Sequence, residues 1–232
     1  MHSRTGSVFS RLANKSTYLQ GGHRGILNCT RQWGKSTVIS IVAAHRALTK
    51  PGSLTLVLSP SLRQSGEFVL KAEECLEPLK IKVRRDGVNK HSLLFPNGSR
   101  IVGLPGKEKT LRGFSNVSLL IVDEASRVPD EVYYAMRPTL ANSNGDLWLM
   151  STPLGQRGFF WKEWMTGKEW KRIHVPATEW ARFSADFLAE ERSKGERAFR
   201  QEYLCEFLDA ENAVFPKDLI DDAWEDFDEL EE

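Results

Sequence analysis

One short segment carries the residue types needed to hold a phosphate group. Residues 29–37 read Cys-Thr-Arg-Gln-Trp-Gly-Lys-Ser-Thr, after the apolar stretch Ile26–Asn28 and before an apolar run that begins at Val38. An order of strand, loop and helix points backbone N–H groups at an anion, because they lie at a helix N-terminus. Here Gly34 lets the backbone approach a phosphate, and Lys35 reaches the β- and γ-phosphates. The segment therefore predicts a phosphate-binding loop.

The other residues of this loop are expected to surround ATP and its magnesium ion. The Ser36 hydroxyl is placed to ligate Mg²⁺, while Thr37 supports the α-phosphate side. The residues predicted to bind ATP are Thr30, Arg31, Gln32, Trp33, Gly34, Lys35, Ser36 and Thr37. The usual pattern GxxxxGK[ST] begins with glycine, whereas this loop begins with Cys29. Alone, the segment is also compatible with a helix N-terminus that carries Gly-Lys-Ser by chance.

A pair of carboxylates supplies the second half of the chemistry. The stretch Ser118–Val122 reads as a buried strand, and Asp123 and Glu124 follow it directly. Ligands of α/β sheets lie at the carboxyl ends of strands. We expect Asp123 to bind the Mg²⁺ shell and Glu124 to position and deprotonate the attacking water. The competing interpretation, a pair that caps the next turn, is weakened by the phosphate loop upstream.

A third strand end carries hydroxyl groups. The apolar stretch Leu147–Met150 is followed by Ser151 and Thr152. These hydroxyls are expected to sense the γ-phosphate and to relay its loss to neighbouring segments. Three strand ends with complementary chemistry favour an ATP-driven motor over a protein that only binds nucleotide.

The surrounding pattern predicts the sheet that must bring these motifs together. Strands alternating with helices indicate an α/β sheet that is covered on both faces. The expected strands are Ile26–Asn28, Leu54–Leu58, Ser99–Leu104, Leu119–Val122 and Leu147–Met150, and the expected helices are Ser36–Leu48, Leu62–Leu79 and Pro129–Arg137. Beyond residue 156 the chain reads as more helical and less sheet-like, with an amphipathic helix over Ala198–Leu208.

Composition narrows the class of protein. The 232 residues are 41% hydrophobic and 27% charged, which is typical of a globular domain and excludes disordered and collagen-like classes. No apolar stretch approaches the roughly 18 residues that cross a bilayer, so we expect no membrane association and a protein that acts in the cytosol. The three cysteines are far apart and predict neither a disulfide framework nor a zinc site.

Charge is unevenly distributed along the chain. Residues 1–116 contain 19 Lys/Arg and 6 Asp/Glu, whereas residues 117–232 contain 13 and 25. A basic half favours an anionic partner, although complementarity between the two halves explains it equally well. A basic cluster that can meet a DNA backbone, or be a solvated face, comprises Lys80, Lys82, Arg84, Arg85 and Lys90.

Taken in order, these motifs resemble one family, the large terminase subunit of tailed bacteriophages, the motor that packages viral DNA into the prohead. Its phosphate loop lacks the first glycine and carries Arg-Gln before Gly-Lys, as Arg31–Ser36 does. Val122–Ala125 resembles its metal-binding strand with the catalytic glutamate, and Ser151–Pro153 resembles its coupling motif. Lesser similarities are Pro96–Ser99, Leu111–Gly113, Arg137–Leu140 and Glu202–Phe207. Together they cover most of residues 26–210.

The resemblance implies an additional-strand P-loop NTPase fold of the RecA-like type: a mainly parallel sheet with helices on both faces and a small C-terminal helical lid. The expected organisation is a loosely structured segment 1–24, an ATPase core 25–175, a lid 176–210 and an acidic tail 211–232. It also implies catalytic arginines, which we assign to Arg31 in the loop and Arg112 presented to a neighbouring subunit.

In functional terms the resemblance implies ATP hydrolysis, with ATP and Mg²⁺ as cofactors, that drives translocation of double-stranded viral DNA. The implied partners are double-stranded DNA, the portal protein and the small terminase subunit. A homo-oligomeric ring is expected when the protein is docked on the prohead, and a monomer in solution is compatible with this. The expected location is the host cytoplasm.

Two features depart from the family. Its members place an aromatic-Gln pair well upstream of the loop to read adenine, whereas here Gln20 follows Leu19 close to the loop. Full-length members also continue into an RNase H-like nuclease domain. The acidic residues Asp221, Asp222 and Asp226 lie on no recognisable nuclease strand, so we predict no nuclease activity in this chain.

Three alternatives stay open on the residues alone. A helicase-like ATPase shares the motifs but needs a second RecA-like domain, for which too few residues follow residue 155. A non-hydrolysing nucleotide-binding remnant that acts as an interaction protein would keep the loop without turnover. A small-molecule kinase shares the loop but lacks the Asp-Glu pair.

Overall fold

The computed structural model describes residues 23–85, 91–106 and 113–209. Several features expected from the sequence lie outside these residues. They are most of the N-terminal segment, the acidic tail with Asp221, Asp222 and Asp226, the candidate adenine contact Gln20, the basic residue Lys90 and the candidate catalytic Arg112.

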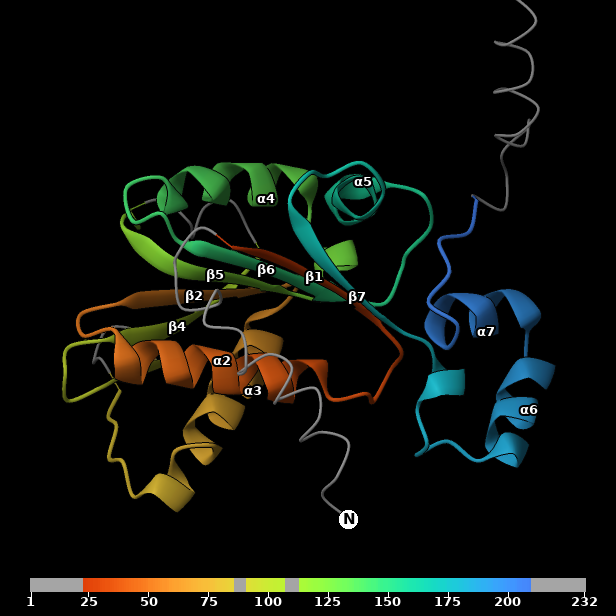
Figure 1. Cartoon of the computed structure of the whole chain (residues 1–232), viewed down its shortest axis with the longest axis horizontal. Helices are drawn as coiled ribbons and strands as arrows, with labels where there is room; N and C mark the ends of the chain where they lie inside the picture. The colour runs from red at the N-terminus through yellow and green to blue at the C-terminus, as the bar shows by residue number, and fades with distance from the viewer. Residues whose placement is uncertain (1–22, 86–90, 107–112, 210–232) are drawn as a thin grey trace, which may run out of the picture.

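A seven-stranded sheet forms the centre of the molecule (Figure 1). Its strands are β1 (Arg24–Cys29), β2 (Leu54–Ser59), β3 (Ser92–Leu94), β4 (Arg100–Pro105), β5 (Val117–Asp123), β6 (Asp146–Ser151) and β7 (Trp170–Val175). Their order is β3-β4-β2-β5-β6-β1-β7, and every neighbouring pair is parallel except β3 with β4. Strand β6 lies between β1 and β5, so the predicted additional-strand, mainly parallel sheet is confirmed.

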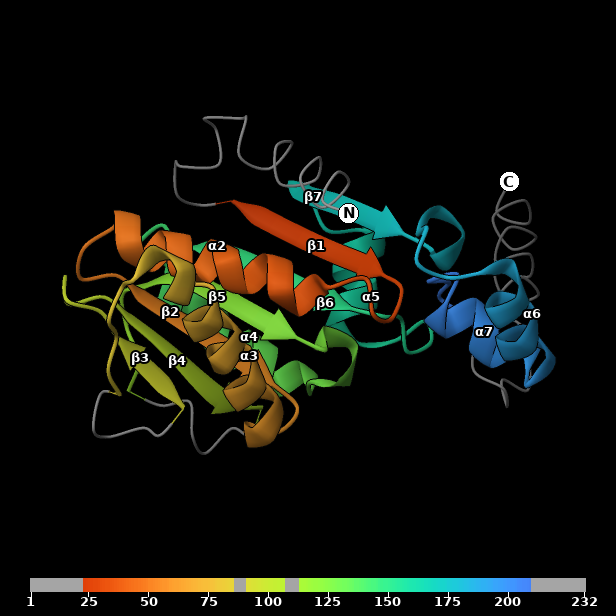
Figure 2. The same ribbon diagram turned by 90° about the horizontal axis from the view of Figure 1, so that it is seen from below.

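Helices cover both faces of this sheet (Figures 1 and 2). Helices α2 (Lys35–Thr49) and α3 (Leu62–Glu74) lie on one face, and α4 (Asp130–Met136) and α5 (Gly158–Met165) lie on the other. Short 3-10 turns are η2 (Glu77–Leu79), η4 (Ala125–Arg127), η5 (Arg137–Leu140) and η6 (Ala177–Glu179). Helices α6 (Ala185–Ser193) and α7 (Glu196–Glu202) form a small unit beyond the carboxyl ends of β1 and β7.

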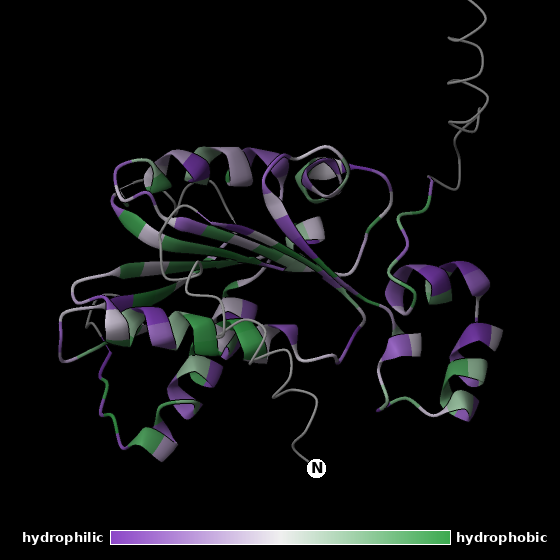
Figure 3. Cartoon of the chain, in the orientation of Figure 1, coloured by the Kyte–Doolittle hydropathy of each residue, from purple (hydrophilic) through white to green (hydrophobic). Residues whose placement is uncertain are grey.

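The core has two layers, one on each face of the sheet. Along β1, Leu27 and Cys29 pack in the layer beneath α2, while Ile26 packs in the opposite layer with α5 residues. Strand β5 is buried along its whole length, as expected for a central parallel strand that is covered on both faces. Figure 3 shows apolar residues concentrated in the strands between the two helical layers.

The expectation of a less sheet-like region after residue 156 is wrong for one element. Residues Trp170–Val175 form β7, which pairs in parallel with β1 along its full length. Only Trp170 of this strand is fully buried, and the others are polar or partly exposed. An edge strand has just one strand neighbour and needs no continuous apolar run, so the sequence pattern did not reveal it.

Two predicted helices are shorter than expected. Helix α7 ends at Glu202, and the chain up to Leu208 is irregular rather than helical. Cys205 has a φ of 61°, and its carbonyl accepts a hydrogen bond from the Asn28 side chain in β1 (2.8 Å). The chain therefore ends its helix, and the backbone of Cys205 accepts a hydrogen bond from a side chain of the sheet instead. Likewise α3 ends at Glu74, and a separate turn follows at Pro78, which cannot continue a helix.

A buried ion pair joins α2 to the start of β6. The Arg46 guanidinium contacts the Asp146 carboxylate and also donates to the carbonyl of Ser118 (2.9 Å). The Asp146 side chain is 4% exposed, and its second oxygen accepts the backbone N–H of His23 (3.0 Å). This network holds the first residues of β1, β5 and β6 together.

Replacing Asp146 with alanine is expected to lower the free energy of unfolding by about 3–5 kcal/mol, because it leaves the Arg46 charge buried without its carboxylate. Urea denaturation followed by circular dichroism measures this. Glu67→Ala is the matched control, since that carboxylate is exposed on α3. Equal stability of the two variants would show that Asp146 contributes nothing to the fold.

Candidate active site

The predicted phosphate loop connects the carboxyl end of β1 to the first turn of α2. Gly34 precedes the helix with φ 98° and ψ 23°, in the left-handed region that glycine adopts without strain. A Cβ at this position would have no atom within 4 Å, so the dihedral angle rather than crowding requires glycine. The first N–H groups of α2 consequently open toward the loop.

Cys29, which stands where glycine is usual, belongs to the sheet rather than to the turn. It is the last residue of β1 and pairs in register with Val175 of β7. Its side chain is fully buried, and this burial raises the pKa of the thiol well above its usual range. A strand position needs no glycine, so the missing glycine leaves the turn at Gly34 intact.

The Lys35 ammonium lies inside the loop. It donates to the carbonyl oxygens of Cys29 (2.8 Å) and Thr30 (3.1 Å), and the residue is 8% exposed. An ammonium group has three donors, and these are its two hydrogen bonds within the described part of the chain. Its position at the mouth of the helix suits contact with a phosphate oxygen.

Ser36 and Asp123 are brought together from α2 and β5. The Ser36 hydroxyl lies 3.5 Å from Asp123 Oδ2. Burial, and then the neighbouring Glu124 charge, raise the pKa of Asp123 to about 6, while the Glu124 N–H and Lys35 act in the opposite direction. One carboxylate and one hydroxyl, completed by phosphate oxygens and water, are a typical ligand set for Mg²⁺. These two residues therefore fit a magnesium ion.

No larger metal cluster competes with this pair. In residues 23–85, 91–106 and 113–209, no group of three or more His, Cys, Asp and Glu side chains is arranged to hold a metal ion. A site built from one carboxylate depends on the substrate phosphates for its remaining ligands, which is the usual arrangement for Mg²⁺ with nucleotides.

Glu124 faces differently from its neighbour. It has φ 51°, and its carboxylate pairs with Arg127 at 3.0 Å, while Asp123 faces Ser36. About a third of the Glu124 side chain is exposed, which leaves it accessible to water. Asp123 thus faces Ser36, the other candidate metal ligand, whereas Glu124 lies beside an arginine.

The third strand end reaches the same place. Ser151, at the end of β6, shares a hydrogen bond with Ser126 of the turn after Glu124 (2.7 Å). The Thr152 hydroxyl donates to Glu202 Oε2 (3.1 Å) in α7. Both hydroxyls are buried, so the candidate coupling residues connect β6 to the turn η4 and to the C-terminal helices.

The remaining loop residues differ in exposure. Arg31 is 65% exposed, and its Nε lies 3.7 Å from Glu202 Oε2. The Thr30 hydroxyl is buried against the carbonyl of Glu202 (3.4 Å). Trp33 is buried and meets Trp180 edge to face, with ring centroids 6.2 Å apart. Thr30 and Trp33 can therefore offer a phosphate only their backbone, whereas Gln32 and Thr37 are exposed.

Arg127 was not singled out from the sequence, and Glu202 was named there only as the first residue of the stretch Glu202–Phe207, without a role at this site. Arg127 contacts Glu124 and Glu202, both at 3.0 Å. The sequence does hint at the contact between Arg127 and Glu124, because Arg127 follows Glu124 by three residues on a turn. Glu202 is 75 residues away from Arg127 in the chain, and no spacing rule connects them.

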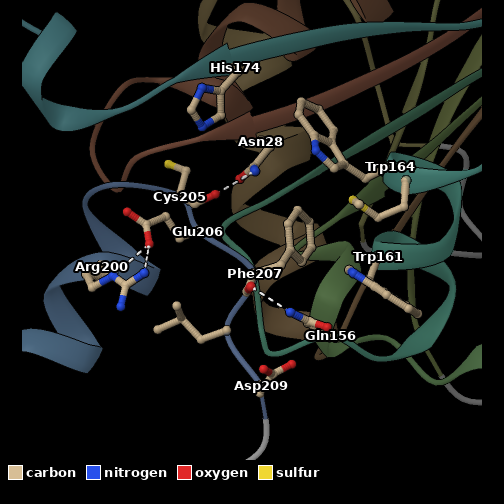
Figure 4. A pocket seen from close by; sticks show the side chains of 12 residues that line it. Asn28, Gln156, Trp161, Trp164, His174, Arg200, Cys205, Glu206, Phe207 and Asp209 are labelled. Carbon is tan, nitrogen blue, oxygen red and sulfur yellow. Dashed lines mark hydrogen bonds and ion pairs between the residues drawn. The ribbon is translucent and has the colours of Figure 1, made fainter. Parts of the chain in front are cut away.

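A cavity of about 770 Å³ opens near this site on the α5 side of the sheet (Figure 4). Its walls include Trp161 and Trp164 from α5 and the segment Cys205–Asp209, which crosses it. None of the residues predicted to bind ATP or metal lines it. The phosphate loop leads instead into α2, on the opposite face.

Comparison with known proteins identifies the family. The family model described as terminase large subunit, T4likevirus-type, N-terminal, matches residues 26–222. The chain belongs to the large terminase subunit family. A large terminase subunit of Thermus phage G20c is 27% identical in an alignment 245 positions long, which covers 80% of this chain and 46% of that protein. The large terminase subunit of Thermus virus P23-45 matches to the same extent. This terminase chain thus spans about half the length of these relatives.

Solved terminase structures share the fold. The large terminase ATPase domain of Thermus phage P74-26 superposes with a TM-score of 0.70 at 24% identity, covering 80% of this chain and 88% of that one. A large terminase from a thermophilic bacteriophage, solved in complex with ADP, gives a TM-score of 0.74 at 13% identity over 93% and 56% of the two chains. At these identities the similarity establishes the architecture alone.

Proposed function

We propose that this terminase chain hydrolyses ATP and that hydrolysis drives the movement of double-stranded DNA during phage genome packaging. One observation carries the proposal: two parallel strands, β1 and β5, bring Lys35, the Ser36–Asp123 pair and Glu124 together at their carboxyl ends. The family, and the ATPase domain named in the Thermus phage P74-26 structure, support it.

Each side chain has a role that its position supports. Lys35 and the first N–H groups of α2 bind and orient the β- and γ-phosphates. Ser36 and Asp123 would hold Mg²⁺, which neutralises charge on the phosphate oxygens when bound. Glu124 accepts a proton from the attacking water, and Arg31 stabilises negative charge on the transferred phosphoryl group.

Steady-state phosphate release by the purified chain tests the proposal. We expect turnover with ATP and excess Mg²⁺. Turnover should be lost when EDTA removes the metal, because Mg²⁺ neutralises charge on the phosphate oxygens. Readdition of Mg²⁺ should restore the rate. If no Mg²⁺-dependent turnover occurs even with double-stranded DNA and portal protein, the chain is a non-hydrolysing nucleotide-binding protein instead.

The wider assignments are inferred from the family. Double-stranded DNA, the portal protein and the small terminase subunit are the proposed partners, with a ring on the prohead and a location in the host cytoplasm. Within the described ranges, no helix is both long and apolar enough to cross a bilayer. The absence of nuclease activity stays a prediction, as does the division into core, lid and tail.

A basic strip offers a place for the DNA backbone. Lys80, Lys82 and Arg84 alternate with Ile81 and Val83, whose side chains pack against the core. In an extended segment this alternation directs Lys82 and Arg84 to the other side, toward solvent. Lys80, which ends the turn η2 with φ 55°, is exposed as well. Arg85 is instead tied to Glu73 at 2.8 Å. The strip therefore narrows the basic cluster to three described residues that can meet phosphates.

Replacing Lys82 and Arg84 together with glutamine is expected to weaken DNA binding and to flatten its dependence on salt. Each lost phosphate contact lowers the slope of log K against log[salt] by about 0.9. Fluorescence anisotropy with duplex DNA over a salt series measures the slope. Lys162→Gln with Lys168→Gln is the matched control, because both lysines are exposed around α5. Equal slopes in the two double variants would remove this strip from the DNA path.

A further inference from the structure

A single guanidinium group connects three segments at the active site. Arg127 Nη1 lies 3.0 Å from Glu124 Oε2 and within 3.5 Å of the Thr152 hydroxyl, while Nη2 lies 3.0 Å from Glu202 Oε1. The two carboxylates thus contact different nitrogens of one rigid planar fork. Such a fork transmits orientation, because moving one partner turns the group that the other partner holds.

Glu202, at the end of α7, likewise contacts several segments. Its Oε2 accepts from Thr152 (3.1 Å) and lies 3.7 Å from Arg31 Nε. Its backbone carbonyl accepts the Arg31 N–H and the Thr30 hydroxyl, both at 3.4 Å. The last residue of α7 is therefore in contact with the phosphate loop, with the candidate coupling residue Thr152 after β6 and, through Arg127, with the candidate catalytic carboxylate.

The ion pair between Arg127 and Glu202 is only partly buried. The side chains of Arg127 and Glu202 are 31% and 17% exposed, so their attraction is screened less than on an open surface and costs less to break than in a dry core. An interaction of intermediate strength can be present in one arrangement and absent in another. This is the property that a switching contact requires.

Resting on the proposed ATPase function, we propose that Arg127 and Glu202 form a switchable ion pair through which helix α7 orients the carboxylate of Glu124. Both are positioning residues. With the pair formed, Arg127 is held at both ends, and Glu124 has one orientation. When α7 moves away, Arg127 loses one anchor, and the Glu124 carboxylate loses its fixed direction.

ATP supplies a reason for the pair to switch. A triphosphate in the loop carries more negative charge than one carboxylate, so it competes with Glu202 for Arg31. Once Arg31 turns to the phosphates, Arg127 still pairs with Glu202, so nucleotide binding favours the arrangement that orients Glu124. Binding of nucleotide and the position of α7 are then coupled, and the coupling is reciprocal.

The test compares kcat and KM for ATP in four single variants of the full chain. Arg127→Gln is expected to lower kcat about 10²-fold, the usual cost of a misplaced catalytic group, with little change in KM. Arg127→Lys should not restore kcat, since an ammonium keeps the charge but lacks the fork. Glu202→Gln should lower kcat roughly 2- to 30-fold, the range of a coupling contact. Glu206→Gln, which breaks the exposed pair with Arg200 in the same segment, should have no effect.

The double variant decides the path. Because Glu202 acts through Arg127, adding Glu202→Gln to Arg127→Gln should cost nothing further. Full additivity would instead route the effect of Glu202 through Arg31 and overturn the inference, as would equal kcat values for Glu202→Gln and Glu206→Gln or full rescue by lysine.

A second measurement does not depend on turnover. Hydrogen exchange of residues 196–204 should be faster in Arg127→Gln and in Glu202→Gln than in wild type and Glu206→Gln, because the anchor of α7 is lost. Unchanged exchange in Arg127→Gln overturns the inference even if the wild type proves inactive. A wild type without turnover overturns the proposed function alone if the exchange of α7 responds as expected.

Discussion

Replacing Glu124 with glutamine is expected to lower kcat for ATP hydrolysis about 10²- to 10⁴-fold and to leave ATP binding nearly unchanged, because an amide cannot accept the proton of the attacking water. The size and hydrogen-bonding reach of the side chain are retained. Glu124 lies outside the Ser36–Asp123 pair, so phosphate and metal contacts should persist. Phosphate release gives kcat, and calorimetric titration with a slowly hydrolysed ATP analogue gives affinity.

The control for this variant is Glu131→Gln, an exposed carboxylate at the start of α4. The competing role for Glu124 is structural, as the partner of Arg127 in a turn. In that case the variant would lose thermal stability in proportion to its activity. A Glu124→Gln protein with wild-type stability and near wild-type kcat would exclude Glu124 as the general base.

Arg31→Ala is the second large effect, with an expected loss in kcat of about 10³-fold or more, since an arginine that meets the transferred phosphoryl group can be worth about 10³–10⁵ in rate. KM for ATP should change far less, because the charge it stabilises develops in the transition state. Arg31→Lys should recover only part of the loss, since lysine lacks the planar fork. Single-turnover measurements of phosphate release separate this chemical step from product release.

The structure allows Arg31 this role because little holds it elsewhere. Its side chain is 65% exposed and its contact with Glu202 is 3.7 Å long, an interaction typically worth less than about 1 kcal/mol. Arg192→Ala is the matched control, as another exposed arginine that is paired with a glutamate in the C-terminal helices. If Arg31→Ala and Arg192→Ala retain the same kcat, Arg31 serves only to pair with Glu202.

The sequence predicted the central sheet and the functional residues at the carboxyl ends of its strands, because both depend on local patterns. Apolar runs such as Leu119–Val122 mark buried parallel strands, and the loop, the carboxylate pair and the hydroxyls each follow such a run directly. Parallel strands end at one edge, so the meeting of Ser36 with Asp123 follows from the strand type and the motifs together.

Elements that depend on distant partners escaped prediction. Strand β7 carries little apolar pattern, because it is an edge strand held by its ladder with β1. The end of α7 at Glu202 has a similar cause, since Cys205 leaves the helix to meet Asn28, 177 residues away in the chain. Helical periodicity is a local pattern, so it does not reveal a distant contact that ends the helix.

The sequence by itself determined which side chains can bind phosphate, hold a metal and activate water, because these roles depend on residue type and on position after a strand. Only the tertiary structure decided how they are connected. Arg127 meets Glu202 across 75 residues, and both meet Thr152 from a third segment. Such a junction exists only once the sheet has assembled and α7 has packed at its edge, since charges of opposite sign attract any partner that the fold brings near.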